Sequence, residues 1–92
     1  MIKVNEYFDG NIKSIGTESE GSRFTVGIMD PGIYTIPTEF EEHVTITFGR
    51  CKVQISGKEW INAGNGDTFI VPAKAEVTFK VDRPVAYICL YK

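Results

Sequence analysis

Hydrophobic and β-branched residues fall in short runs along the chain, and turn-forming residues such as Asp30-Pro31-Gly32 and Ser56-Gly57-Lys58 separate these runs. Turn signals that recur about every eight to twelve residues are typical of an all-β sandwich or barrel. The runs predict strands over residues 23–29, 33–36, 43–48, 52–56, 60–62, 68–71, 76–81 and 85–91.

Apolar and polar positions alternate within several of these runs. In 76–81, Val77, Phe79 and Val81 occupy every second position, and in 43–48 Val44, Ile46 and Phe48 do the same. Successive side chains of a strand point to opposite faces, so each of these two sets is expected to face a core. No window keeps a helical period, and we expect one all-β domain over residues 1–92.

The last run, residues 85–91, is apolar on both of its faces. A strand of a two-layer sandwich normally keeps one face in water. Two explanations fit: a second copy of the chain packs on this face and forms a symmetric homodimer, or an N-terminal segment of the same chain covers it.

Composition and charge exclude several classes of function. The hydrophobic fraction of 42% suffices for a folded core. Ten basic and twelve acidic residues are scattered, with a net charge of −2 and no basic stripe of the kind that binds nucleic acid. No apolar run approaches the ~18 residues of a membrane span, and the first residues lack the apolar core of a signal peptide. We expect a soluble cytoplasmic protein without a nucleic-acid or membrane partner.

The two cysteines, Cys51 and Cys89, each lie in an apolar, strand-like run. They form no CxxC pair, so redox or zinc chemistry lacks its usual sequence signal. We expect both to be small buried hydrophobic residues rather than a disulfide or a reactive thiol.

Two spaced motifs give the first resemblance to a known fold. Glu42 is followed by six residues and then Gly49, and Gly66 is followed by five residues and then Pro72. This order resembles the paired motifs of cupins, which implies a cupin-type jelly-roll barrel of short antiparallel strands.

The metal ligands of metal-binding cupins are missing from the corresponding positions. Those proteins carry a His-x-His pair before the Glu and a further His after the Pro, whereas residues 34–38 contain no histidine and the later position falls near Val77. The sole histidine, His43, is expected on the strand face opposite to Glu42. A first-row metal wants three or four ligands, so the sequence predicts no metal site.

A narrower resemblance covers nearly the whole chain. The matching positions are Asn5-Glu6-Tyr7-Phe8, Gly10, Lys13-Ser14-Ile15-Gly16, Arg23, Val26-Gly27, Met29, Gly32, Tyr34-Thr35, Thr38, Glu42, Gly49, Trp60, Gly66, Phe69, Val71-Pro72, Tyr87, Cys89 and Tyr91. Together they resemble the pyrimidine/purine nucleoside phosphorylases, a family of single-domain cupins. The resemblance implies a homodimer without metal or other cofactor. It also implies cleavage of purine and pyrimidine nucleosides by inorganic phosphate to free base and ribose 1-phosphate.

Such a reaction needs groups that hold phosphate and orient the ribose. Arg23 is our candidate for phosphate, because a guanidinium is planar, always charged and able to bond two oxygens. The alternative is a solvated arginine at a strand end. Glu42 is our candidate for the ribose hydroxyls, because it is predicted to point inward among apolar neighbours. The alternative is a structural network with Arg23 or a tyrosine hydroxyl.

A broad range of bases favours stacking over base-specific hydrogen bonds, because every base has a π face. Tyr34 and Tyr87 are candidates to stack on the base or donate a hydroxyl, and Thr38 is a candidate to bond a phosphate or ribose oxygen. The structural alternatives are core packing for each tyrosine and a strand-start hydroxyl for Thr38. Tyr91 is expected in the core. No general acid is evident, so solvent or a tyrosine would protonate the base.

Two other classes of function remain open. A metal-free cupin could bind a small nucleoside, sugar or phosphate without turning it over, and its barrel mouth would look the same. A purely structural dimeric β module would bind no small molecule. Substitution of Arg23 and Glu42 separates the first two, because only an enzyme has turnover to lose.

Overall fold

The computed structural model describes all residues, 1–92, and consists of ten β-strands joined by short turns. Every pair of neighbouring strands is antiparallel. The strands are β1 (Lys3–Tyr7), β2 (Ile12–Ser19), β3 (Ser22–Met29), β4 (Gly32–Pro37), β5 (Glu42–Phe48), β6 (Arg50–Ile55), β7 (Ile61–Gly64), β8 (Thr68–Val71), β9 (Glu76–Val81) and β10 (Val85–Tyr91).

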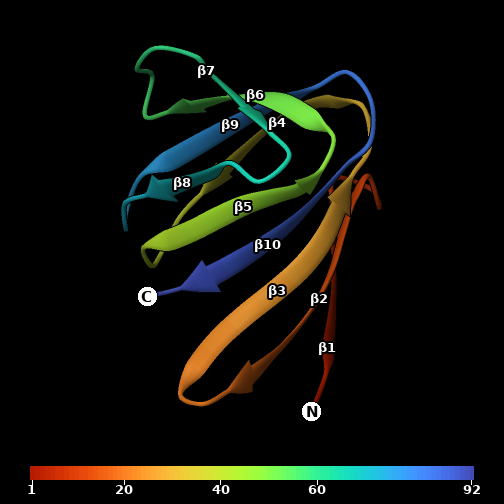
Figure 1. The fold of residues 1–92 in the computed structure, drawn as a ribbon, viewed down its shortest axis with the longest axis vertical. Helices are drawn as coiled ribbons and strands as arrows, with labels where there is room; N and C mark the ends of the chain where they lie inside the picture. The colour runs from red at the N-terminus through yellow and green to blue at the C-terminus, as the bar shows by residue number, and fades with distance from the viewer.

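The strands form two sheets of unequal width. The larger sheet has the order β1-β2-β3-β10-β5-β8, and the smaller sheet has the order β4-β9-β6-β7. In Figure 1, β1, β2 and β3 extend downward beyond the smaller sheet, which lies at the top and back. This double-sheet arrangement confirms the all-β, cupin-type fold expected from the sequence. The structure has no helix with the length and apolarity needed to cross a bilayer.

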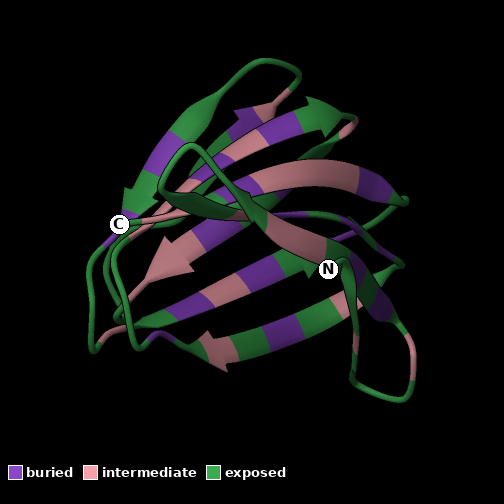
Figure 2. Cartoon of the chain, turned by 90° about the horizontal axis from the view of Figure 1, so that it is seen from below, coloured by how far each residue is buried: buried purple, intermediate pink, exposed green.

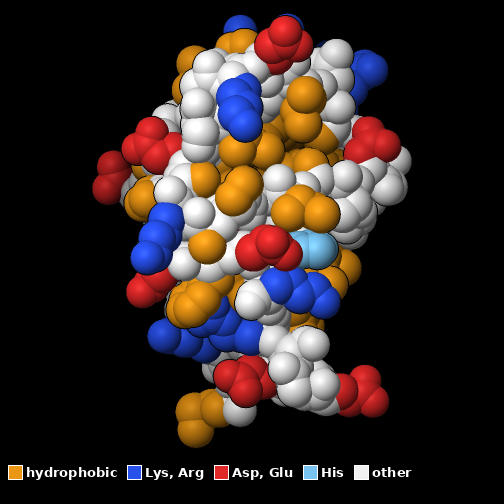
Figure 3. Space-filling view, turned by 90° about the vertical axis from the view of Figure 1, so that its left-hand side faces the viewer, with side chains coloured by type: hydrophobic (Ala, Val, Ile, Leu, Met, Phe, Trp, Pro, Cys, Tyr) orange, Lys and Arg blue, Asp and Glu red, His pale blue; other side chains and the backbone are white.

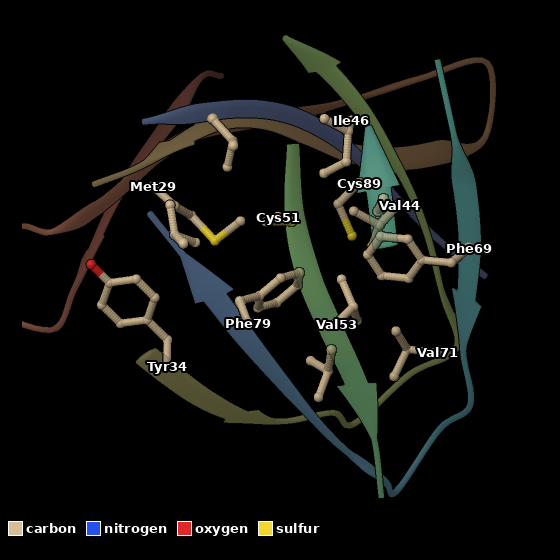
Figure 4. Packing of buried hydrophobic residues seen from close by; sticks show 14 of the residues in the cluster. Met29, Tyr34, Val44, Ile46, Cys51, Val53, Phe69, Val71, Phe79 and Cys89 are labelled. Atoms are coloured by element: carbon tan, nitrogen blue, oxygen red, sulfur yellow. The ribbon is translucent and has the colours of Figure 1, made fainter. Parts of the chain in front are cut away.

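The core lies between the two sheets. Val77, Phe79 and Val81 of β9 are all buried, as their alternation predicts. Figure 2 shows the same alternation of buried and exposed positions along other strands. In Figure 4, Phe69 of the larger sheet and Phe79 of the smaller sheet both point into the core, and their ring centroids lie 6.1 Å apart. Burial of apolar surface of this kind is the main stabilising contribution in a chain of this size.

Both cysteines are free and buried, as the sequence analysis expected. Cys51 belongs to β6 and Cys89 to β10, so they come from opposite sheets. Burial raises the pKa of the Cys51 thiol to about 11. This thiol therefore stays protonated at neutral pH and acts as a small apolar core residue.

The prediction that Phe48 faces the core with Val44 and Ile46 is wrong. Tyr87 of β10 lies opposite Ile46, but the next residue, Ala86, lies opposite Phe48, and the register shifts between them. The extra residue on β5 is a β-bulge, and a bulge reverses the alternation beyond it. Phe48 is consequently 68% exposed on the outer face.

The sequence analysis predicted no strand before residue 23, yet β1 and β2 form one edge of the larger sheet. Several of their inward residues are polar or small, as at Asn5 and Ser14, while apolar Val4 and Ile15 point outward and are exposed. Apolar residues thus lie on the solvent side, which removes the usual signal of a half-buried strand.

The suggestion that an N-terminal segment covers the second face of residues 85–91 is also wrong. β10 lies inside the larger sheet between β3 and β5, and β1 and β2 continue this sheet beyond β3 rather than crossing its outer face. No segment of the chain covers the outward side chain of Leu90, which remains exposed.

Truncation of a core side chain should destabilise the fold strongly. Ile46 is 0% exposed, and we expect Ile46→Ala to lower the free energy of unfolding by about 2–5 kcal/mol. Ile33 is 67% exposed, so the same substitution there should change it by less than about 0.5 kcal/mol. Urea unfolding at one protein concentration, followed by the fluorescence of the single tryptophan, measures both. Equal losses in the two variants would contradict this account of the core.

Candidate functional site

A large cavity opens on the inner face of the larger sheet. It has a volume of about 1020 Å³, and its lining comes mainly from β1, β2, β3 and β10, with β4 and β9 on the side of the smaller sheet. It exists because the larger sheet is two strands wider, as its order shows. Concave sites of this size are typical of proteins that bind small molecules.

Strand register arranges the cavity floor in rows across the larger sheet, and three of these rows hold most of its polar side chains. Residues directly opposite one another in antiparallel strands share a face. The first row contains Glu18 of β2, Arg23 of β3, Tyr91 of β10 and Glu42 of β5, since Arg23 lies opposite Glu18 and Tyr91, and Tyr91 lies opposite Glu42. Arg23 and Glu42, the two residues predicted to be catalytic, therefore lie on strands separated only by β10, and both line the cavity.

Two aromatic rings hold the guanidinium of Arg23. Its Cζ lies 4.2 Å from the ring centroid of Tyr91 and 5.0 Å from that of Phe40. The ion pairs of the chain join Lys13 to Glu6 and His43 to Glu41 and do not involve Arg23. Aromatic contacts stabilise a cation through the ring faces and leave the N–H edges free for oxygen acceptors. Arg23 is thus oriented without being neutralised, which suits it to bind an anion.

Glu42 is half-buried, and its Oε1 accepts a hydrogen bond from Cys89 Sγ at 3.6 Å. Burial raises the pKa of this carboxyl, and the Cys89 hydrogen bond and the positive charge of Arg23 lower it in part. The net shift is upward. Burial of a carboxylate without full compensation destabilises a fold, so a binding role for this group accounts for its position.

The second row has small side chains at its centre. These are Gly16 of β2, Thr25 of β3 and Cys89 of β10, which lie opposite one another in register, and Lys3 of β1 and Val44 of β5 continue the row on either side. A Cβ on Gly16 would lie 2.7 Å from the methyl group of Thr25, so no larger residue fits there. Burial raises the pKa of Cys89 to about 12, which keeps its thiol a hydrogen-bond donor to Glu42. The short side chains at the centre of this row form a low floor of the cavity, with open space above them beside the first row.

The third row contains Asn5 of β1, Ser14 of β2, Gly27 of β3 and Tyr87 of β10. The Asn5 Nδ2 donates to Ser14 Oγ at 3.4 Å. The Tyr87 ring lies against Gly27, where a Cβ would be only 2.5 Å from the hydroxyl oxygen. Burial raises the pKa of Tyr87 to about 12, and a hydrogen bond with Ser14 offsets part of this shift. The third row is a polar, uncharged end of the cavity.

Two of the predicted site residues lie outside the cavity. Tyr34 is buried and donates its hydroxyl to the carbonyl oxygens of Asp30 and Pro31 at 2.6 and 3.1 Å. Thr38 is also buried and donates its hydroxyl to the Pro72 carbonyl oxygen at 2.7 Å. Both hydroxyls already bond the main chain. The structure therefore places Tyr34 in the core, which was its alternative, whereas Thr38 follows the end of β4 and does not start a strand.

His43 points to the outer face of the larger sheet, opposite in direction to Glu42, as its strand position predicts. Its Nε2 lies 2.7 Å from Glu41 Oε2, and Figure 3 shows the histidine at the surface beside an acidic side chain. No group of three or more His, Cys, Asp or Glu side chains is placed to hold a metal ion.

Four cavity residues were not proposed as site residues from the sequence: Asn5, Ser14, Phe40 and Tyr91. Three of them, all but Phe40, belong to the blocks that resemble the phosphorylase family, and that was the available signal. Phe40 carries no such signal, because its contact with Arg23 depends on the path of the loop before β5. Tyr91 was expected in the core; it packs against the core and also lines the cavity.

The raised pKa of Glu42 makes a pH-dependent stability testable. The folded state binds the proton more tightly than the unfolded state, so stability is full below the ordinary value of 4.5 and falls as pH rises through the folded-state pKa. We expect Glu42→Gln to have a higher Tm than the wild type at pH 8. The difference should vanish as pH falls below 4.5.

Glu59→Gln removes the same charge from an exposed loop and is the matched control for net charge. Thermal unfolding followed by circular dichroism from pH 4 to pH 8 measures the three proteins. A constant Tm difference between Glu42→Gln and the wild type at every pH would show that ionisation of Glu42 is not its source.

Proteins of known name match the chain over almost its full length. The family model described as pyrimidine/purine nucleoside phosphorylase matches residues 2–91. A pyrimidine/purine nucleoside phosphorylase of Pectobacterium carotovorum is 44% identical over 93 residues, covering 99% of each chain. One of Aeromonas salmonicida is 41% identical over 90 residues, covering 97% of this chain and 96% of the relative.

Solved structures give the same picture of the fold. A Vibrio parahaemolyticus protein of unknown function superposes with a TM-score of 0.96 at 34% identity, covering 100% of this chain and 99% of that one. An ethanolamine utilization protein Q of Salmonella typhimurium has a TM-score of 0.78 at 17% identity and shares the fold alone, over 96% of this chain and 76% of that one. From the family match and the full-length relatives, this chain belongs to the pyrimidine/purine nucleoside phosphorylase family.

Proposed function

We propose that this protein catalyses the phosphorolysis of purine and pyrimidine nucleosides to free base and ribose 1-phosphate, with inorganic phosphate as co-substrate and no metal. The observation that carries the proposal is the first row, in which an unpaired Arg23 faces one cavity together with a half-buried Glu42. The names of the family members give the reaction class, and the row supplies groups that suit it.

Each end of the first row suits one part of the substrate. The free N–H edge of Arg23 binds phosphate oxygens, because bidentate bonds to such oxygens are strong and directional. Glu42 accepts hydrogen bonds from the ribose hydroxyls. Its carboxylate reaches the second row, where it meets Cys89 Sγ, so the sugar lies over the low floor of Gly16 and Thr25.

The reaction follows from this placement. A phosphate oxygen forms a bond to C1′ of the ribose while the bond from C1′ to the base nitrogen breaks and leaves its electron pair on the base. The base then takes a proton from water. The sugar gains oxocarbenium character in the transition state, as in other glycosyl transfers. Glu42 and the bound phosphate stabilise that positive charge, while Arg23 fixes the attacking oxygen, so positioning and electrostatics supply the catalysis.

Phosphate-dependent release of base tests the proposal directly. We expect the wild-type protein to release uracil from uridine and adenine from adenosine only when phosphate is present, with ribose 1-phosphate as the second product and no loss on addition of a chelator. Chromatography of the bases and the sugar phosphate measures this. Release without phosphate would mean hydrolysis. No release at high protein concentration would favour a cupin that binds small molecules without turnover.

Variants of the first row add a second arm to this test. Arg23→Ala removes the anion-binding group, and we expect kcat/KM to fall about 100-fold or more. Arg23→Lys should also be impaired, because an ammonium cannot bond two oxygens in the guanidinium geometry. Arg83→Ala, in an exposed turn outside the cavity, is the matched control and should keep wild-type activity.

We also propose that the protein is a homodimer that buries the outer face of the larger sheet. The outward residues of its two central strands are all apolar: Phe24, Val26 and Ile28 on β3, and Ala86, Ile88 and Leu90 on β10. A monomeric protein rarely exposes a continuous apolar patch of this kind. Because the patch carries no charge, a second copy related by twofold symmetry can pack on it without placing like charges together.

Light scattering after size-exclusion chromatography tests the dimer. We expect the wild type to have twice the mass of the chain. Val26→Glu, which places a charge at the centre of the patch, should give a monomer that is still folded. Ile33→Glu places the same charge on the exposed face of the smaller sheet and should remain dimeric. A monomeric wild type at micromolar concentration would contradict this proposal.

A further inference from the structure

The third row gives the base end of the cavity a specific hydrogen-bond donor. We propose that the Asn5 side-chain amide donates a hydrogen bond to the departing base, at the acceptor atom attached to the ring carbon beside the glycosidic nitrogen. This inference rests on the proposed phosphorolysis. It assigns a catalytic contact to a residue of β1. It also gives a physical reason why one site would act on both classes of base.

Strand geometry places Asn5 in the row farther from Arg23. Adjacent rows are two residues apart along each strand, so the first and third rows are separated by about 13 Å along the strands, and β1 lies two strands away from β3. Phosphate at Arg23 and ribose on the second row leave the base on the third row, beside Asn5. The same end of the cavity is lined by Tyr7 and Phe8, whose rings offer surfaces for stacking.

The contacts of Asn5 leave a donor available. Its Nδ2 carries two hydrogens, and the bond to Ser14 Oγ at 3.4 Å uses one of them. Ser14 is itself buried and lies in the same row as Tyr87, so it anchors the amide from below. Asn5 is half-buried and lines the cavity, which directs its second amide hydrogen and its carbonyl oxygen to a ligand.

The chemistry of the leaving group explains why one amide serves two classes of base. When the bond from C1′ to nitrogen breaks, its electron pair is delocalised onto the base, and purine N3 and pyrimidine O2, which lie on the same edge of the base, are acceptors that share this charge. Both are acceptor atoms in the neutral base as well. A donor at this point strengthens its bond as the charge develops, so it stabilises the transition state more than the bound substrate.

Asn5→Ala and Asn5→Asp test the assignment, with Asn62→Ala on the exposed surface of β7 as the matched control. We expect Asn5→Ala to lower kcat for both uridine and adenosine about 10- to 100-fold, the range of a hydrogen bond to a charged acceptor. Asn5→Asp keeps the size of the side chain and replaces the donor by a negative charge, so it should lose more. The control should keep the wild-type kcat.

A leaving-group comparison distinguishes this role from a structural one. The base of 5-fluorouridine is more acidic than uracil and departs with less assistance, so Asn5→Ala should lower its phosphorolysis by a smaller factor than that of uridine. Equal factors for the two nucleosides, or an unchanged kcat in Asn5→Ala, would overturn the inference and leave the phosphorolysis intact. A wild type that releases no base with phosphate would instead overturn the proposed function and this inference together.

Discussion

The antiparallel register between β3, β10 and β5 is the constraint on which the site depends. It sets Arg23 opposite Tyr91 and Tyr91 opposite Glu42, so groups that are distant in the sequence meet in one row. A shift of one residue in either pairing would turn these side chains to the outer face. The same shift would also expose the core residues of these strands, for example Met29 and Val85. The strand register that buries these core residues and stabilises the fold therefore also fixes the geometry of the site.

Much of the fold could be predicted from the sequence, because strands with one buried face carry a clear alternation, as in Val77, Phe79 and Val81. The alternation failed where function or a local irregularity changes it. β1 and β2 turn Asn5 and Ser14 toward the cavity, so they lack the pattern of a strand against a core. The face of Phe48 depends on a bulge, which no periodic rule anticipates.

The site residues divide in the same way. Glu42 could be chosen because a charged group at an inward position is rare without a reason, and Arg23 could be chosen because it lies at a family-matched position and carries a guanidinium. Tyr34 and Thr38 fitted the family pattern equally well, yet their hydroxyls bond main-chain carbonyls, and only the folded path of the chain reveals this. In Arg23 and Glu42, stability and binding have opposite requirements. The two opposite charges lie near each other without an ion pair, which is a less stable arrangement than a direct contact. Because neither group is paired, both are available to a substrate that contacts them at once.

The position of β1 at the edge of the larger sheet has a consequence for motion. β1 pairs with β2 alone, whereas β3, β10 and β5 each pair on both sides. Edge elements with few partners open locally at lower free energy than central ones, so backbone amides of β1 are expected to exchange with solvent before those of β10. The first row thus lies mainly on strands that pair on both sides, and the third row ends on an edge strand. In the proposed binding mode, phosphate and the sugar meet the strands that are paired on both sides, while the base, which varies in size, meets the edge strand that can adjust.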